Sequence, residues 1–166
     1  MTERFALRVL AASERALARD AALEALRAAL PAWADVIEVG STAVEGVIGK
    51  GDIDLLVRVP RERFGEARAI VDSIYARNPD QLANDQYQGY LVPSVLDVAI
   101  QLTVRDGPYD QFIAFLDALR ASPELVERYN TLKRAWDGES MDDYRGAKSR
   151  FIAEVLREHG HVRARE

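Results

Sequence analysis

Two stretches in the first half of the chain have apolar residues at helical spacing. Residues 13–30 are rich in Ala, Leu, Glu and Arg, and their apolar positions roughly follow one stripe that stops at Pro31. Residues 61–77 show the same spacing and are followed by an Asn-Pro-Asp run, which favours a loop. The pattern predicts helices over residues 13–30 and 61–77.

Three other stretches are typical of β-strands. Residues 35–40 and 52–59 contain short runs of Val, Ile and Leu. Residues 95–104 alternate, with apolar side chains on one face and Asp97 and every second residue after it on the other. A Pro-Ser turn joins this segment to residues 86–92 in a predicted hairpin. We expect residues 35–40, 52–59 and 95–104 to lie in one mixed sheet.

The last third of the chain, from about residue 109 to residue 157, returns to helical patterns. Ser122, which precedes a proline, predicts a helix N-terminus, and Ser140 with Asp143 predicts a capping box that opens a last helix. Neither a repeat nor a long linker divides the chain. The sequence therefore predicts a single α+β (or α/β) domain over residues 1–166, in which a small mixed sheet carries flanking helices and a C-terminal helical appendage.

Composition narrows the classes of function. The 166 residues are 48% hydrophobic and 30% charged, so the chain can form a packed core and is not disordered throughout. Its 22 basic and 27 acidic residues give a net charge of −5, whereas a protein that grips the nucleic-acid backbone usually carries the opposite sign. The lack of cysteine excludes a disulfide scaffold, a cysteine-ligated zinc site and a thiol nucleophile. The net negative charge suits small or metal-chelated ligands better than nucleic acid, which is not expected as the main ligand.

The sequence contains no pattern typical of a membrane or secretory segment. No apolar stretch approaches the roughly 18 residues that a membrane-spanning helix needs. Charged residues interrupt residues 1–15, so this stretch lacks the apolar centre of a signal peptide. We therefore expect a cytoplasmic protein with no membrane partner.

The segment between the first two predicted strands carries the candidate chemistry. Gly40 and Ser41 end one strand and offer open backbone N–H groups and a hydroxyl, which bind phosphate oxygens well. Asp52 and Asp54 begin the next strand, and residues two apart in a strand share a face. Two carboxylates held this close repel each other unless a cation lies between them. A hard divalent cation, Mg²⁺ (or Mn²⁺), held by both carboxylates and by substrate phosphates is the expected cofactor.

A Gly-Ser pair followed by Asp-x-Asp and apolar residues resembles the signature of the nucleotidyltransferase superfamily. Within that superfamily the chain resembles the GrpB-like family, in which the Gly-Ser-Thr at the strand end is followed by Val, Gly and Lys, here Val44, Gly46 and Lys50. Two helical segments in the C-terminal half also resemble those of the family. The resemblance covers about residues 35–157 and implies a nucleotidyltransferase-like fold.

The resemblance also implies further site residues. It implies a third carboxylate on a neighbouring strand. Asp97 is the candidate because it lies on the polar face of its predicted strand. The alternative is that Asp97 lies at the rim of the site, exposed to water. Lys50 and Lys148 resemble family lysines that could neutralise a triphosphate, and Gln101 could contact a base or an acceptor. The implied catalytic and metal-binding residues are Asp52, Asp54 and Asp97, and the implied nucleotide-binding residues are Gly40, Ser41, Lys50 and Lys148.

Several positions depart from the family pattern. Glu45 stands where the family usually has Pro, and Asp52 stands where it often has an apolar residue. Gln101 and Thr103 occupy the matching positions of a His-x-His pair. The extra carboxylate makes the predicted metal site more similar to that of active transferases, whereas the loss of the histidines argues against a role specific to GrpB-type proteins.

These features leave three functions open. The first, which we expect, is an enzyme that moves a nucleoside monophosphate from an NTP, expected to be ATP, to a hydroxyl of a small molecule, a protein or an RNA end. The second is an accessory domain that binds a nucleotide, a phosphate or a CoA-like ligand without turnover, as the fusion of GrpB-type domains to a coenzyme A biosynthesis kinase implies. The third is a structural or interaction protein, which would leave the coincidence of Gly-Ser and Asp-x-Asp unexplained. Convergence of Asp52, Asp54 and Asp97 on one point favours the enzyme, and an Asp97 that faces away favours the accessory domain.

Overall fold

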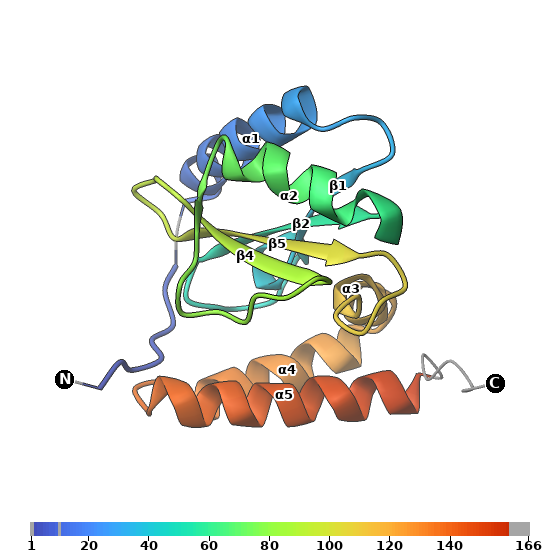
Figure 1. Cartoon of the computed structure of the whole chain (residues 1–166). Helices are drawn as coiled ribbons and strands as arrows, with labels where there is room; N and C mark the ends of the chain where they lie inside the picture. Colours follow the sequence, from blue (N-terminus) through green and yellow to red (C-terminus); the bar gives the residue numbers. More distant parts are fainter. Residues whose placement is uncertain (1, 10, 160–166) are drawn as a thin grey trace.

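A mixed β-sheet lies between two layers of helices (Figure 1). The computed structural model describes residues 2–9 and 11–159. Helices α1 (Ala12–Ala29) and α2 (Phe64–Asp72) cover one face of the sheet. Helices α3 (Phe112–Ala121), α4 (Pro123–Ala135) and α5 (Met141–Glu158) lie on the other side. The α+β class, with a small mixed sheet, flanking helices and C-terminal helices, is confirmed.

The strands of the sheet follow the order β1-β2-β5-β4-β3. Their bounds are β1 (Asp35–Val39), β2 (Ile53–Val59), β3 (Ala76–Arg77), β4 (Tyr87–Val92) and β5 (Val98–Val104). Strands β2 and β5 pair in parallel, and the other neighbouring pairs are antiparallel. The three segments predicted to share one sheet, which contain β1, β2 and β5, do so. The parallel register sets Asp54 beside Ala99, so the residues that begin β2 lie next to those that begin β5.

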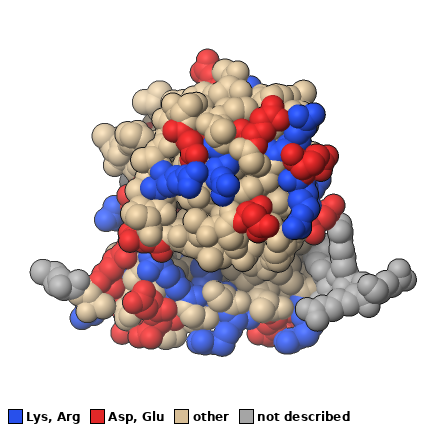
Figure 2. All heavy atoms as spheres, in the orientation of Figure 1, with Lys and Arg blue, Asp and Glu red and all other residues tan. Residues whose placement is uncertain are grey.

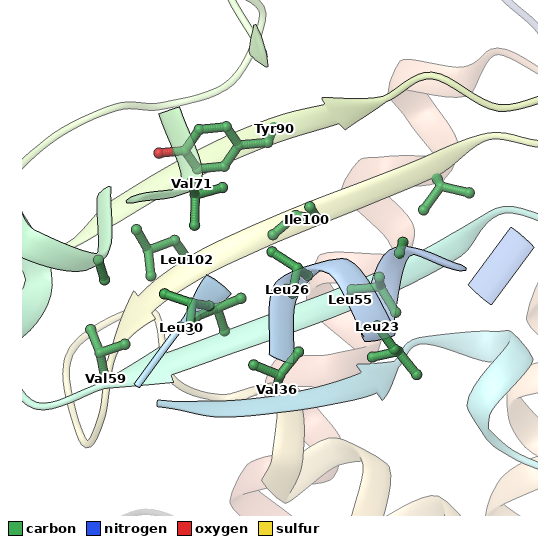
Figure 3. Packing of buried hydrophobic residues seen from close by; sticks show 14 of the residues in the cluster. Leu23, Leu26, Leu30, Val36, Leu55, Val59, Val71, Tyr90, Ile100 and Leu102 are labelled. Atoms are coloured by element: carbon green, nitrogen blue, oxygen red, sulfur yellow. The ribbon is translucent and has the colours of Figure 1, made fainter. Parts of the chain in front are cut away.

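Alternate residues of the two central strands point toward α1 and α2 and form the larger core. Leu55 of β2 and Ile100 of β5 are completely buried there, and Leu26 of α1 packs against this layer (Figure 3). Because both faces of the central strands are covered, β2 is a nearly continuous apolar run rather than an alternating one. The apolar run recognised in the sequence is therefore a central strand.

A second core lies on the opposite face of the sheet. Leu56 of β2 points to this side and packs with residues of α3, α4 and α5, among them Leu119, Leu125 and Val155. Both predicted caps are present: the Ser122 hydroxyl accepts from the Leu125 N–H at 3.1 Å, and the Ser140 hydroxyl accepts from the Asp143 N–H at 3.4 Å. Of the helices in the described part of the chain, none is long and apolar enough to cross a membrane.

The segment before α1 is tied to the C-terminal helices. The Phe5 ring stacks on Tyr144 of α5 with ring centroids 3.8 Å apart, and the Phe5 N–H donates to the Glu139 carbonyl at 2.9 Å. Phe5 is 1% exposed. Residues 2–9 therefore close one end of the space between the sheet and α5.

Two predicted boundaries were wrong. The predicted helix over residues 61–77 is a 3₁₀ turn at Arg61–Arg63 followed by α2, and Ala76–Arg77 forms strand β3. These two residues pair with β4 because its outer edge offers unpaired backbone groups, which helical spacing in the sequence does not reveal. The predicted two-residue hairpin turn is a longer connection, residues 93–97, because Pro93 has no N–H with which to continue the β4 ladder. Asp97 consequently precedes β5 instead of lying within it.

Replacing Leu26 by alanine tests the packing of α1. We predict that Leu26→Ala lowers the free energy of unfolding by about 2–5 kcal/mol, because the side chain is fully buried between α1 and the sheet. Leu17→Ala is the matched control in the same helix, since Leu17 is 77% exposed and its loss should change stability by less than about 0.5 kcal/mol. Urea unfolding measures both values. Equal losses would contradict the packing of α1 described above.

Candidate active site

One cavity of about 620 Å³ brings the predicted site residues together. It is lined by all seven of them: Gly40, Ser41, Lys50, Asp52, Asp54, Asp97 and Lys148. Gln101 lines it as well. The walls come from the sheet on one side and from α3, α4 and α5 on the other, and the surface is hollowed between these layers (Figure 2). Residues that are far apart in the sequence thus share one solvent-accessible space.

The turn after β1 requires a glycine. Gly40 has φ +76°, which L-residues rarely adopt, and it leads into the short 3₁₀ helix Ser41–Ala43. A Cβ at this position would lie 2.5 Å from Oδ2 of Asp54, which is closer than two non-bonded atoms can approach. Gly40 is therefore required both by its backbone conformation and by the space that the Asp54 carboxylate occupies.

Asp54 is the most strongly perturbed carboxylate of the site. It lies near the start of β2, and the Gln101 amide donates to its Oδ1 at 3.3 Å. Burial, and next the neighbouring Asp52 carboxylate, raise the pKa of Asp54 above its ordinary value. Lys148, the Gln101 amide and Lys50 act in the opposite direction but do not cancel the rise. A positive charge placed at this carboxylate would relieve both causes.

Asp52 lies at the more open side of the same carboxylate pair. It precedes β2, its side chain is 32% exposed, and Lys50 Nζ is 3.6 Å from its Oδ2. The main chain here runs from the loop into β2, so Asp52 and Asp54 lie on the same face, as predicted from their spacing. Ile53 between them points into the core on the other face.

Asp97 directly precedes β5, lines the same cavity as this pair and is exposed. Its backbone carbonyl accepts from the Ile53 N–H at 2.8 Å, at the first pair of the parallel β2–β5 register. Within residues 2–9 and 11–159, no three His, Asp or Glu side chains form a group that could hold a metal ion. The role of Asp97 as a third ligand stays a prediction.

Lys133 of α4 is a site residue that the sequence analysis missed. It is 2% exposed, donates to the Ser41 hydroxyl and to the Ile48 carbonyl (2.7 Å for the latter), and lies 4.4 Å from the centre of the Tyr129 ring. Burial, and next the charge of Lys148, lower the pKa of Lys133 to about 7. The signal in the sequence is its position: Lys133 continues the buried stripe of Leu125 and Tyr129 at four-residue steps, where a lysine is unexpected.

Asn130, one turn before Lys133, holds the same loop. Its side-chain oxygen accepts from the Ile48 N–H at 2.9 Å, and its side-chain N–H donates to the Gly46 carbonyl at 2.8 Å. The loop between Ser41 and β2 has no regular structure after its first turn, so these contacts satisfy backbone groups that would otherwise lack partners. Helix α4 thereby determines where the candidate phosphate-binding turn lies.

Tyr129 of α4 and Tyr144 of α5 line the same cavity as this turn. Burial raises the pKa of both tyrosines. Lys148 lies one helical turn beyond Tyr144 on α5. Its positive charge acts to lower the pKa of both Asp54 and Lys133. The charge of Lys148 therefore affects both a carboxylate of the cavity and the buried lysine of α4.

Helix α3 gives the cavity an apolar wall. Phe112, Phe115, Leu116 and Leu119 line it, together with Ile152 of α5. A lining of apolar groups with a few charged groups is typical of small-molecule sites, and 620 Å³ lies within their usual range of about 300–1,000 Å³. The cavity suits a ligand that has both a charged and an apolar part.

The donor set of the carboxylate pair fits a hard cation. Asp52 and Asp54 supply only oxygen atoms. Burial, and next the charge of Asp52, raise the pKa of Asp54, and a divalent cation would offset both effects. Mg²⁺ commonly takes one or two protein carboxylates and completes its shell with water and phosphate oxygens. The residues present therefore fit Mg²⁺ or Mn²⁺ held jointly with a phosphorylated ligand.

Substituting Gly40 tests the contact between the turn and Asp54. We predict that Gly40→Ala destabilises the protein more than Gly138→Ala, because both glycines have positive φ but a Cβ at Gly138 meets nothing within 4 Å. Gly40 also has ψ −169°, a combination with positive φ that essentially only glycine adopts, so strain of about 1–3 kcal/mol adds to the clash at this position. Urea unfolding gives the two free energies. If the two variants lose the same stability, the close approach of Asp54 to Gly40 is wrong.

The sequence and the fold both match known proteins. The family model of GrpB protein matches residues 14–158. A UPF0157 protein of Vibrio cholerae serotype O1 is 34% identical over 130 residues, which cover 78% of this chain and 69% of the relative. The crystal structure of the conserved protein GrpB from Enterococcus faecalis is similar with a TM-score of 0.68 at 21% identity, covering 92% of this chain and 98% of that one.

Two nucleotidyltransferases share the fold over a smaller part of their length. The Cid1 poly(U) polymerase bound to Mg 3′-dATP gives a TM-score of 0.50 at 14% identity, covering 76% of this chain and 41% of the polymerase. A cytoplasmic RNA terminal U-transferase gives a TM-score of 0.50 at 17% identity, covering 75% and 38%. At these identities the likeness shows a nucleotidyltransferase-like fold and no more. With the family match over most of its length and the Vibrio relative, this chain belongs to the GrpB family.

Proposed function

We propose that this protein is a metal-dependent nucleotidyltransferase that moves a nucleoside monophosphate from an NTP, with ATP as the expected donor, to an acceptor hydroxyl. The observation that carries the proposal is that the Gly40–Ser41 turn, the Asp52–Asp54 pair and two lysines line the same cavity. Phosphate binding, cation binding and charge neutralisation are the three tasks that such a transfer requires. The nucleotidyltransferase-like fold supports the same reading.

The Gly40–Ser41 turn would bind the outer phosphates of the nucleotide. Backbone N–H groups at a tight turn and the Ser41 hydroxyl are good donors to phosphate oxygens. Lys50, beside Asp52, and Lys148, on α5, would offset the negative charge of the triphosphate from two sides of the cavity. Binding at this turn would leave the α-phosphate near the start of β2.

Asp52 and Asp54 would hold Mg²⁺ or Mn²⁺. A cation bound there supplies charge neutralisation to the triphosphate and to the leaving pyrophosphate. The Gln101 amide, which donates to Asp54, keeps that carboxylate oriented while leaving its other oxygen free of this contact. The role of these residues is thus to place and hold charge rather than to react covalently.

The transfer conserves atoms and charge in one displacement. The acceptor oxygen forms a bond to the α-phosphorus, the bond from that phosphorus to the bridging oxygen on the β side breaks, and pyrophosphate leaves. Asp97, exposed at the cavity, would either take the proton from the acceptor hydroxyl or complete the cation site.

The cavity favours a small acceptor over a protein or an RNA end. Its volume of about 620 Å³ suits one nucleotide with a small molecule beside it, and α3 offers that molecule an apolar wall. The net charge of −5 also opposes general binding to RNA. The acceptor we propose is a small molecule that carries a hydroxyl group and an apolar part.

A second candidate is an accessory domain of the GrpB type that binds a nucleotide or a phosphate without turnover. The exposed position of Asp97 favours it, because a carboxylate that does not join Asp52 and Asp54 leaves the reaction centre less complete. Incubation with labelled NTPs, Mg²⁺ or Mn²⁺ and a panel of hydroxyl acceptors separates the two candidates. Release of pyrophosphate that depends on an acceptor supports the enzyme, and nucleotide binding with no release under any condition supports the accessory domain.

Asp54→Asn separates a functional from a structural role of this carboxylate. The pKa of Asp54 is higher in the folded protein than in the unfolded chain. At pH values above the ordinary aspartate pKa, the native state therefore binds more protons than the unfolded state, and the free energy of unfolding falls as the pH rises. We predict that Asp54→Asn abolishes metal-dependent nucleotide binding and yet raises the free energy of unfolding at neutral pH by about 0.5–2 kcal/mol. The gain should shrink as the pH falls toward about 4.

Asp110→Asn is the control for this prediction. Asp110 accepts two hydrogen bonds of 2.7 Å from Arg58 outside the site, so its substitution should lower stability and leave nucleotide binding unchanged. Chemical unfolding over a pH series and titration with Mg²⁺ and ATP provide both measurements. An Asp54→Asn variant that binds nucleotide normally, or that is less stable at neutral pH, contradicts the assignment.

Ser41 and Asp97 should give two different defects. Ser41→Ala should weaken NTP binding by roughly 1.5–3 kcal/mol, the amount typical of a lost hydrogen bond to a charged group. Asp97→Asn should leave NTP binding nearly unchanged and slow turnover by about 10²-fold or more, because it acts at the reaction centre. Equilibrium binding and the rate of pyrophosphate release measure the two effects. An Asp97→Asn variant with the wild-type rate would remove Asp97 from the reaction.

A further inference from the structure

Lys133 is a buried lysine whose contacts are all to uncharged groups. Its Nζ donates to the Ser41 hydroxyl and to the Ile48 carbonyl, and it faces the ring of Tyr129. It takes part in none of the ion pairs within 4.0 Å that the described residues form. Burying an ammonium ion is costly when no counter-charge accompanies it.

The two observed acceptors match the neutral form of the side chain. A neutral amine has two N–H groups, and Ser41 and Ile48 provide two acceptors. The ammonium form has a third N–H, for which the folded protein supplies the face of Tyr129 at 4.4 Å. The protonated form is therefore less well satisfied than the neutral form in the free protein.

Charged groups on two neighbouring elements face Lys133. Lys148 on α5 opposes protonation, whereas Asp52 and Asp54 at the start of β2 favour it. Burial outweighs the carboxylates, and the pKa of Lys133 falls to about 7. The free protein is thus balanced between the two protonation states near neutral pH.

An anion at Ser41 would change this balance. The Ser41 oxygen accepts from Lys133, and a hydroxyl that accepts can still donate its own proton to a group in the cavity. A phosphate that accepts this proton would bring a negative charge close to Lys133 and supply the counter-charge that the fold lacks. Protonation of the lysine and binding of the anion would then stabilise each other.

We propose that Lys133 is a positioning residue that couples the binding of a phosphate-bearing anion at Ser41 to the uptake of one proton. The coupling rests on the proposed function only for the nature of the anion, the triphosphate of a nucleotide. Above the pH at which free Lys133 loses its proton, the affinity for the anion falls about tenfold for each further pH unit. Lys133 thereby makes the occupancy of the turn sensitive to pH through Ser41 and without touching the reacting atoms.

The proton uptake can be measured by calorimetry. ATP with Mg²⁺ is titrated into the protein at about pH 8, where phosphate groups are already ionised, in two buffers of different ionisation enthalpy. Wild type should take up close to one proton per nucleotide, and its Kd should rise about tenfold for each pH unit above this. Lys133→Met should take up none and bind with a Kd that does not change with pH. Lys133→Arg, which stays charged, should also take up none.

Asn130→Ala is the matched control for loss of the loop contacts. Asn130 holds Gly46 and Ile48 from the same helix but carries no charge, so this variant should weaken binding and still take up the proton. If Asn130→Ala abolishes the uptake as Lys133→Met does, the effect belongs to the loop and the proposal is overturned.

A second readout needs no nucleotide. The unfolded chain keeps the lysine proton to about pH 10, whereas folded Lys133 releases it near pH 7. Between these two pH values the unfolded state binds more protons than the native state. The free energy of unfolding therefore rises with pH over this range. This rise should be absent in Lys133→Met. The same pH dependence in both proteins would overturn the proposal.

The outcomes also distinguish this proposal from the proposed function. Nucleotide binding without proton uptake contradicts the role of Lys133 and leaves the proposed function standing. Binding of inorganic tripolyphosphate with proton uptake, in the absence of nucleotide binding, supports the role of Lys133 and contradicts the proposed nucleotide. If neither compound binds at any pH, both are wrong.

Discussion

The parallel pairing of β2 with β5 is the constraint on which the candidate site depends. Parallel strands begin at the same edge of a sheet, so the residues that lead into β2 and into β5 meet there. Leu55 and Ile100, both fully buried, hold the register from the core side. A slip of one residue would turn Asp54 into the core and leave Leu55 in the cavity, at the cost of burying a charge. The apolar core and the polar site thus lie on opposite faces of the same pair of strands, β2 and β5.

The C-terminal helices are part of the site rather than an appendage to it. The loop from Ser41 to β2 has little regular structure of its own, and α4 supplies its backbone partners through Asn130 and Lys133. Helix α3 forms the apolar wall of the cavity, and α5 contributes Lys148. The segment before α1 packs on α5 through Phe5 and closes one end of the same space. Loss of these helices would therefore remove the cavity and not only stability.

The free protein keeps two kinds of charge that it stabilises poorly. The pKa of Asp54 is raised and that of Lys133 is lowered, and burial is the largest cause in both. Each shift favours the uncharged form of its group. A cation at the carboxylates together with a phosphate at Ser41 would favour the charged form of both, so the two ligands would assist each other. Sites that are organised for a transition state commonly carry such a cost in the free protein.

The sequence by itself determined the fold class, most elements and the spacing of the Gly40–Ser41 turn and the Asp52–Asp54 pair. The period of two in residues 95–104 and the caps at Ser122 and Ser140 are local features, and local chemistry decides them. The spacing of Asp52 and Asp54 is equally local, because any strand puts residues two apart on one face.

Only the tertiary structure decided what depends on contacts between distant segments. Ala76–Arg77 became a strand because β4 offered a free edge, and residues 93–97 became a long connection that places Asp97 before β5. Lys133 could be read in the sequence as one more helical lysine, since its partners Ser41 and Ile48 lie more than eighty residues away. Its burial, and hence its chemistry, follows from the packing of α4 against that loop, which no local pattern encodes.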